Sequence, residues 1–145
     1  LIKDSEGVKE IKTDDYFKSK KVVLFALPGA FTPTCSARHL PGYIKYYQDI
    51  KDKGVDIIAC MAVNDPHVMR AWGLANEIEG KIDMLSDSDC SVSVSLGLDM
   101  NFGRIMGHRS RRFAMIVEDN LIKKSFVEDV GAFEVSTAEN ILKNL

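Results

Sequence analysis

The sequence KVVLFALPGAFTPTCS, residues 21–36, contains the strongest local signals of structure in this chain. Residues 21–27 are a run of apolar and β-branched residues, which is typical of a buried strand. Thr32 and Pro33 then form a helix start, because threonine is a good N-cap and proline suits the first helical position. A strand that passes through a short Pro-Gly loop into a helix indicates an α/β domain.

Strands and helices alternate through the rest of the chain. The hydrophobic spacing predicts, in chain order, a helix over 32–53, a strand over 55–63, a helix over 65–77, a short strand over 81–86, a turn and brief helix over 86–95, a hairpin of 112–118 with 121–127, and a closing helix over 137–145. We therefore expect one α/β domain over residues 1–145, with a central mixed β-sheet flanked by helices.

Composition excludes several classes of protein. The chain has 145 residues, of which 46% are hydrophobic and 28% charged, with a formal net charge of −2. This is ordinary globular composition, not that of a disordered chain, a collagen or a disulfide-rich miniprotein. The charge gives no reason to expect a nucleic acid partner, and no apolar run approaches the roughly 20 residues that span a membrane.

Three cysteines cannot all pair within one chain, which favours a reducing intracellular compartment or a reactive thiol. The chain begins with Leu1 rather than Met, so we expect a processed or trimmed form. Localisation therefore stays open between the cytoplasm and, if a presequence was removed, an organelle such as the mitochondrion or plastid.

Cys35 is the residue best placed for chemistry. The helix start at Thr32 and Pro33 puts it in the first helical turn, where free N–H groups and the helix dipole favour an anion. A thiolate is such an anion, so the position predicts a reactive cysteine. The alternative is an inert core cysteine that happens to lie at a helix start.

The stretch PGAFTPTCS resembles the active-site signature of the peroxiredoxins, in the type II or peroxiredoxin-5-like branch. Other motifs similar to that branch follow in the same order: HLPG at 39–42, VNDP at 63–66, AWG at 71–73, RSRRFA at 109–114 and GAF at 131–133. The resemblance implies a thioredoxin-like fold and an antioxidant enzyme that reduces hydrogen peroxide and small alkyl hydroperoxides with thiols. It also implies a homodimer.

The same resemblance implies a role for each residue of the site. Cys35 matches the peroxidatic cysteine, Thr32 the threonine that hydrogen-bonds the thiolate or peroxide, and Pro28 the proline that shields the sulfur. Arg112 matches the arginine that holds the charge, and the backbone N–H groups of Thr34 and Cys35 would be further donors. Lowering a thiol's pKa raises its thiolate fraction but weakens that thiolate as a nucleophile, so we expect Arg112 and Thr32 to supply the acceleration.

Arg112 is one of a cluster that includes Arg109 and Arg111, and such clusters are usually solvated. Strand alternation puts Arg112 on one face with Ala114 and Arg111 on the other face, without deciding which face points inward. The family motif favours Arg112, so we expect Arg109 and Arg111 to be surface or interface charges.

The reaction would leave Cys35 as a sulfenic acid, which a thiol must reduce. Residues 131–138, where some members of the branch carry a resolving cysteine, read GAFEVSTA and contain none. Cys60 is then the candidate resolving cysteine, although its apolar surroundings also fit a buried core thiol, and Cys90 is a weaker candidate. We therefore expect an external donor, glutathione with glutaredoxin in the first place and thioredoxin in the second.

Other functions fit the sequence less well. A dithiol oxidoreductase would need Cys-x-x-Cys, but Thr32 lies three residues before Cys35. A redox sensor would use the same residues and differ only in turning over slowly.

Cys35 with His39 gives two metal ligands where zinc needs about four, and no Gly-rich phosphate loop is present, so no metal or cofactor is expected. A Cys–His pair on one helical face is conceivable, but the family motif makes His39 a packing residue.

Overall fold

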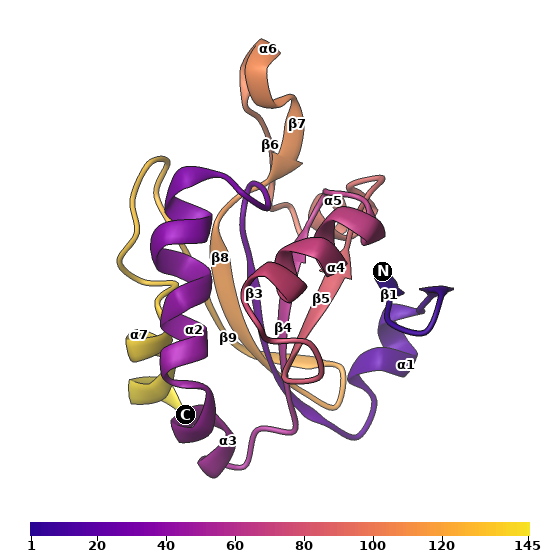
Figure 1. Cartoon of the computed structure of the whole chain (residues 1–145). Helices are drawn as coiled ribbons and strands as arrows, with labels where there is room; N and C mark the ends of the chain where they lie inside the picture. Colours follow the sequence, from indigo (N-terminus) through magenta and orange to yellow (C-terminus); the bar gives the residue numbers. More distant parts are fainter.

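A seven-stranded mixed sheet forms the centre of the molecule, and helices cover both of its faces (Figure 1). The structure, a computed structural model, describes all residues 1–145. In spatial order the strands are β2 (Val8–Glu10), β1 (Ile2–Asp4), β5 (Ile82–Ser86), β4 (Ile57–Ala62), β3 (Lys21–Ala26), β8 (Phe113–Glu118) and β9 (Leu121–Val127). The strands β5, β4 and β3 run parallel, whereas β1 and β8 border them antiparallel. The expected α/β architecture with a mixed sheet is confirmed.

The helices divide between the two faces of the sheet. They are α1 (Thr13–Phe17), α2 (Leu40–Lys45), α3 (Tyr47–Asp52), α4 (Pro66–Ala75), α5 (Ser91–Ser95), α6 (Gly103–Met106) and α7 (Ala138–Asn144). Buried residues of α2, α4 and α7 join one apolar core with Val23 and Phe25 of β3. Buried residues of α1 form a second core with Val22 and Leu24, because successive strand residues point to opposite faces.

Several predicted starts and turns are confirmed by their hydrogen bonds and dihedral angles. The Asp65 side chain caps α4 by accepting from the Val68 N–H at 3.0 Å. The Thr137 hydroxyl accepts from the Asn140 N–H at 3.2 Å at the start of α7. Asp119 and Asn120 have φ values of 45° and 64°, the left-handed pair that a tight β-hairpin requires.

The continuous helix expected over 32–53 is wrong in two places. Residues Cys35–His39 form a wider helical turn, η1, in which the Leu40 N–H donates to the Cys35 carbonyl five residues back. Pro41 has no N–H to donate to the preceding turn, which favours such a widening. The chain leaves helical geometry again at Tyr46, where α2 ends and α3 begins.

Two short hairpins were not predicted. One is formed by β1 and β2 at the N-terminal end of the chain. The other, called the arm, consists of β6 (Asp99–Asn101), α6 and β7 (His108–Ser110). In Figure 1 the arm projects from the body of the molecule, at the end where the β3–η1 loop lies.

Candidate active site

The loop that joins β3 to η1 rests on the carboxyl ends of the parallel strands. Asn64, just beyond β4, accepts from the Ala30 N–H through its Oδ1 at 2.8 Å. The Ser86 hydroxyl at the end of β5 in turn donates to the Asn64 carbonyl at 2.6 Å. Open α/β sheets bind ligands at this edge, so the loop is in the expected place for a functional site.

Thr32 precedes the helical turn that carries Cys35, but its hydroxyl does not cap that turn. The hydroxyl donates to the Gly29 carbonyl at 2.6 Å, and the expectation of a side-chain N-cap at Thr32 is wrong. The Thr32 carbonyl does accept the first helical hydrogen bond, from the Ser36 N–H at 2.9 Å. The N–H groups of Thr34 and Cys35 therefore precede the helical ladder, as in the first turn of any helix.

Arg112 reaches Cys35 from the start of β8. Its Nη2 donates to the Cys35 Sγ at 3.3 Å, and Cys35 is fully buried. Ala114 and Ile116 lie in the same apolar core as Cys35, whereas Phe113 and Met115 lie in the other. The structure thus puts Arg112 on the side of the sheet that faces the thiol, with a permanent positive charge beside a buried sulfur.

His39 holds the other nitrogen of that guanidinium. Arg112 Nη1 donates to His39 Nδ1 at 2.9 Å, and His39 Nε2 lies 3.1 Å from the Ser136 carbonyl. Burial, and then the charge of Arg112, lowers the pKa of His39 to about 3. A neutral imidazole carries one donor and one acceptor, so Nδ1 accepts from the arginine and Nε2–H donates to Ser136. His39 therefore packs, as expected, but it also contacts Cys35 indirectly through Arg112.

The Phe133 ring covers this buried pair. It lies edge-on to His39, with ring centroids 5.2 Å apart. The guanidinium of Arg38 lies 4.7 Å from the centre of the same ring, and that of Arg112 lies 5.8 Å from it. Phe133 therefore lies between the exposed Arg38 and the half-buried Arg112 and covers the buried His39.

Arg109 and Arg111 are half-buried, and both donate to backbone carbonyls, while their expected place at an interface stays a prediction. Arg109 Nε donates to the Met106 carbonyl at 2.6 Å and its Nη1 to the Pro28 carbonyl at 3.0 Å. A Cβ atom at Gly29 would lie only 2.3 Å from Arg109 Nη1, so the glycine leaves the room that the guanidinium occupies. Arg111 Nη2 donates to the Glu128 carbonyl at 2.9 Å. Both arginines are half-buried and tie the arm and β9 to the site.

Cys60 and Cys90 are free thiols in different surroundings. Cys60 is fully buried in β4 and belongs to the same apolar core as Cys35. Burial raises the pKa of Cys60 well above its ordinary value, and the neighbouring Cys35 adds to this. Cys90 is the residue just before α5. Burial, and then the charge of Asp87, raises its pKa. Neither thiol is set up to ionise.

A small cavity opens beside the arginine. It has a volume of about 160 Å³, and Pro28, Thr34 and Arg112 form one side of it. Met100 and Phe102 of the arm form an apolar side. Of the predicted site residues, Pro28, Thr34 and Arg112 line the cavity, whereas Thr32 and the fully buried Cys35 do not.

No group of three or more His, Cys, Asp or Glu side chains is arranged to hold a metal ion. None of the helices combines the length and the apolar character needed to cross a bilayer. The functional residues missed by the sequence analysis are Arg109, Glu128 and Ser136. Arg109 donates to the carbonyls of Met106 and Pro28, and Ser136 contacts His39 through its own carbonyl. A pattern of side chains in the sequence does not reveal such backbone contacts.

Known proteins resemble this chain over nearly all of its length. The model of the Redoxin family matches residues 2–142. Peroxiredoxin-2B of Arabidopsis thaliana is 45% identical over 127 residues, which is 87% of this chain and 78% of that protein. Reduced Prx3 of Vibrio vulnificus in complex with hydrogen peroxide is 47% identical, with a TM-score of 0.96 over 99% of this chain and 91% of that one. The antioxidant protein of Plasmodium falciparum, a 1-Cys peroxiredoxin, is 36% identical, with a TM-score of 0.88 over 95% of this chain and 87% of that one.

These likenesses and the fold define a class of enzyme, the thiol-dependent peroxidases built on the thioredoxin-like fold. The chain belongs to the Redoxin family and, within it, to the peroxiredoxins. It is accordingly an antioxidant oxidoreductase, and the expected fold and enzyme class are confirmed.

Proposed function

We propose that Cys35 is the peroxidatic cysteine and that the enzyme reduces hydrogen peroxide and small alkyl hydroperoxides. The observation that carries the proposal is the 3.3 Å contact between Arg112 Nη2 and the fully buried Cys35 Sγ. A guanidinium at this distance puts a permanent positive charge and an N–H donor beside the sulfur that is proposed to react. It also has N–H groups left over for an oxygen that gains negative charge as the O–O bond breaks.

In the proposed reaction the Cys35 thiolate attacks the terminal oxygen of the peroxide. An S–O bond forms, the O–O bond breaks, and the leaving oxygen takes its electron pair and a proton to become water or an alcohol. The sulfur is oxidised to a sulfenic acid and the peroxide is reduced. One thiol then forms a mixed disulfide with the release of water, and a second thiol restores Cys35 and leaves as part of a disulfide.

The other site residues have distinct proposed parts in this reaction. The Thr32 hydroxyl donates its proton to the Gly29 carbonyl, so it offers an incoming peroxide a lone pair that accepts the peroxide's own proton. Pro28 lacks an N–H group and shields the sulfur with an apolar ring. The N–H groups of Thr34 and Cys35, which precede the helical ladder, are available to an oxyanion.

The cavity limits the proposed substrates by size. Its volume of about 160 Å³ is close to that of a roughly 150 Å³ protein cavity that admits benzene, a molecule of six heavy atoms. Its apolar side, formed by Met100 and Phe102, suits a short alkyl group on a peroxide that reaches Arg112. Hydrogen peroxide and a four-carbon hydroperoxide fit such a space, whereas a long-chain hydroperoxide would have to leave its tail in solvent.

We expect Cys35 to be recycled by an external thiol, glutathione with glutaredoxin in the first place and thioredoxin in the second. Cys60 is fully buried and its pKa is raised, so it is a poor attacking thiol without local opening of β4. The test is steady-state peroxide consumption by the wild type and Cys60→Ser with each donor system. We expect Cys60→Ser to retain turnover with glutaredoxin within about twofold. Loss of that turnover would make Cys60 the resolving cysteine and contradict the proposal.

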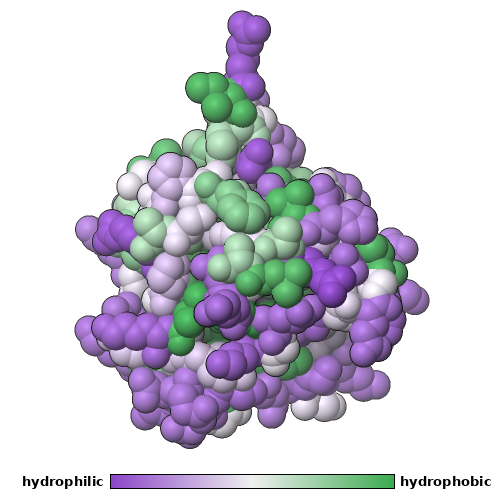
Figure 2. Space-filling view, viewed as in Figure 1, coloured by the Kyte–Doolittle hydropathy of each residue, from purple (hydrophilic) through white to green (hydrophobic).

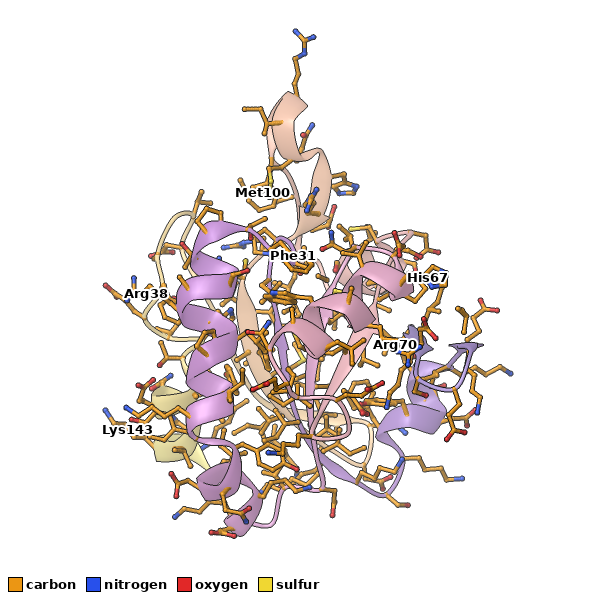
Figure 3. All side chains as sticks on the ribbon, viewed as in Figure 1. Phe31, Arg38, His67, Arg70, Met100 and Lys143 are labelled. Carbon is orange, nitrogen blue, oxygen red and sulfur yellow. The ribbon has the colours of Figure 1, made fainter.

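We also propose a homodimer that uses the face around the arm. Ile105 at the tip of the arm is 95% exposed, and Phe31 of the β3–η1 loop is 58% exposed. Figure 2 shows apolar surface on the arm and below it, and Figure 3 places Phe31 and Met100 together at its root. Exposed large apolar side chains that gather in one region are typical of protein interfaces.

The dimer proposal predicts that Ile105→Asp shifts the protein from dimer to monomer. A charge buried in an interface without a partner costs several kcal/mol. A cost of this size weakens the association of the two subunits strongly. Light scattering coupled to size exclusion, over a range of concentrations, measures the change. Leu121→Asp is the matched control, because Leu121 is 57% exposed and lies at the hairpin turn far from the arm. A dimer that persists in Ile105→Asp would contradict the proposed interface.

A further inference from the structure

Glu128, the residue after β9, holds the chain between β9 and α7 in place with a buried carboxylate. Only 3% of the residue is exposed. Its Oε2 accepts from the N–H of Glu134 at 2.6 Å, the N–H of Ser136 at 3.2 Å and the hydroxyl of Ser136 at 2.9 Å. Its Oε1 accepts from the N–H of Val135 at 3.0 Å. Burial opposes the charge, but these hydrogen bonds outweigh it and hold the pKa of Glu128 below its ordinary value.

The carboxylate therefore fixes the position of the Ser136 carbonyl. Ser136 is fully buried, with both its N–H and its hydroxyl on Glu128. Its carbonyl points to α2 and η1, where it accepts from the Tyr43 hydroxyl at 2.8 Å and from His39 Nε2 at 3.1 Å. The ring of Phe25 stacks on that of Tyr43, with the two ring centroids 3.9 Å apart.

The Ser136 carbonyl decides which nitrogen of His39 carries the proton. A carbonyl can only accept, so the proton lies on Nε2 and the lone pair on Nδ1. That lone pair accepts from Arg112 Nη1, whose neighbour Nη2 reaches the Cys35 Sγ. In the other tautomer an N–H would face the guanidinium N–H groups, which would push Arg112 away from the sulfur.

We propose that Glu128 is a positioning residue for the peroxidase reaction: through Ser136 it fixes the tautomer of His39 and thereby aims Arg112 at Cys35. Glu128 also contacts Arg112 directly through the backbone, because the Glu128 N–H donates to the Arg112 carbonyl at 3.0 Å. Glu128 thus holds the main chain of Arg112 directly, and it acts on the guanidinium through Ser136 and His39. The inference rests on the proposed role of Arg112 in the reaction.

The test is the variant Glu128→Gln, which keeps the shape of the side chain. A glutamine amide has one accepting oxygen and one donating NH₂ group, so it cannot accept all four hydrogen bonds. The proposal predicts that the rate constant of Cys35 with hydrogen peroxide falls by about 10- to 100-fold, the size of effect expected when a reacting group is misplaced by about 1 Å. Glu134→Gln is the matched control, because it removes an exposed charge six residues away in the same loop.

Two further readouts separate positioning from a general loss of structure. Histidine ¹⁵N spectra report the tautomer directly, and the wild type must show His39 protonated at Nε2. Glu128→Gln must show a mixture of tautomers or a shift to Nδ1–H. In a double-mutant cycle with His39→Leu, the effect of Glu128→Gln must largely disappear, because the residue through which it acts is gone.

Each outcome decides the matter. An Nδ1–H tautomer in the wild type would overturn the inference without any variant, even if Glu128→Gln did not fold. So would a folded Glu128→Gln with the wild-type rate constant, or an undiminished effect of Glu128→Gln in the His39→Leu background. If instead the wild type itself did not react with peroxide at Cys35, the proposed function would fail. The tautomer spectra would still test whether Glu128 fixes the tautomer of His39 through Ser136.

Discussion

Replacing Arg112 with lysine is expected to slow the reaction with hydrogen peroxide by about 100- to 1,000-fold, the usual loss when one donor to a developing oxyanion is removed. The guanidinium donates to His39 Nδ1 and to the Cys35 Sγ through two nitrogens of one plane. A lysine ammonium is a single flexible point charge and cannot reproduce that fork. The thiol would lose both a fixed positive neighbour and an oriented donor.

Rapid-mixing measurement of peroxide consumption in a single turnover gives this rate constant without any reductant. Arg104→Lys is the matched control, because Arg104 is exposed on α6 and makes no contact with the site. Thermal unfolding of both variants checks that the fold is kept. A rate constant for Arg112→Lys within about threefold of the wild type would show that the guanidinium geometry does not matter.

Replacing Cys35 with serine is expected to abolish peroxide consumption completely. A hydroxyl has almost the same size as a thiol, so the buried position can still be filled, but serine has no sulfur and cannot form a sulfenic acid. Cys90→Ser is expected to retain the activity, because Cys90 lies in a separate region with its own raised pKa. Steady-state consumption with glutathione and glutaredoxin measures all three proteins under the same conditions. Undiminished activity in Cys35→Ser would remove Cys35 from the reaction altogether.

The parts of the fold that could be predicted from sequence are those with strong hydrophobic patterns or specific turn residues. The run at 21–27 has no polar residue after Lys21, and it forms the inner strand β3 with five buried residues. Asp119 and Asn120 tolerate a left-handed backbone, so the β8–β9 turn could be placed to the residue.

The parts that were missed have weak patterns. β1, β2, β6 and β7 have only three residues each, which is too short for alternation to emerge. Their partners come from tertiary structure, as with Ile2 of β1, which pairs with Ser86 of β5. The wider turn at Cys35–His39 was missed because the sequence analysis assumed one continuous helix over 32–53. The missing N–H of Pro41 was the available signal.

The same division holds for the candidate site. Alternation along β8 correctly separates Arg111 from Arg112, since Ala114 and Ile116 lie in the core of Cys35. The position of Arg109 could not be predicted, because it depends on the space left by Gly29 and on the Pro28 carbonyl. The chain of contacts from Glu128 to His39 runs through the carbonyl of Ser136, so its side chains give no pattern in the sequence.

We propose that peroxide oxidises the Sγ atom of Cys35, which Arg112 contacts. The most direct measurement is to treat the reduced protein with one equivalent of hydrogen peroxide in the presence of a reagent that traps sulfenic acids, and to locate the adduct by peptide mass spectrometry. We expect the adduct on Cys35 in the wild type, and on Cys35 again in Cys60→Ser. An adduct found on Cys60 or Cys90 while Cys35 remains a free thiol would contradict it.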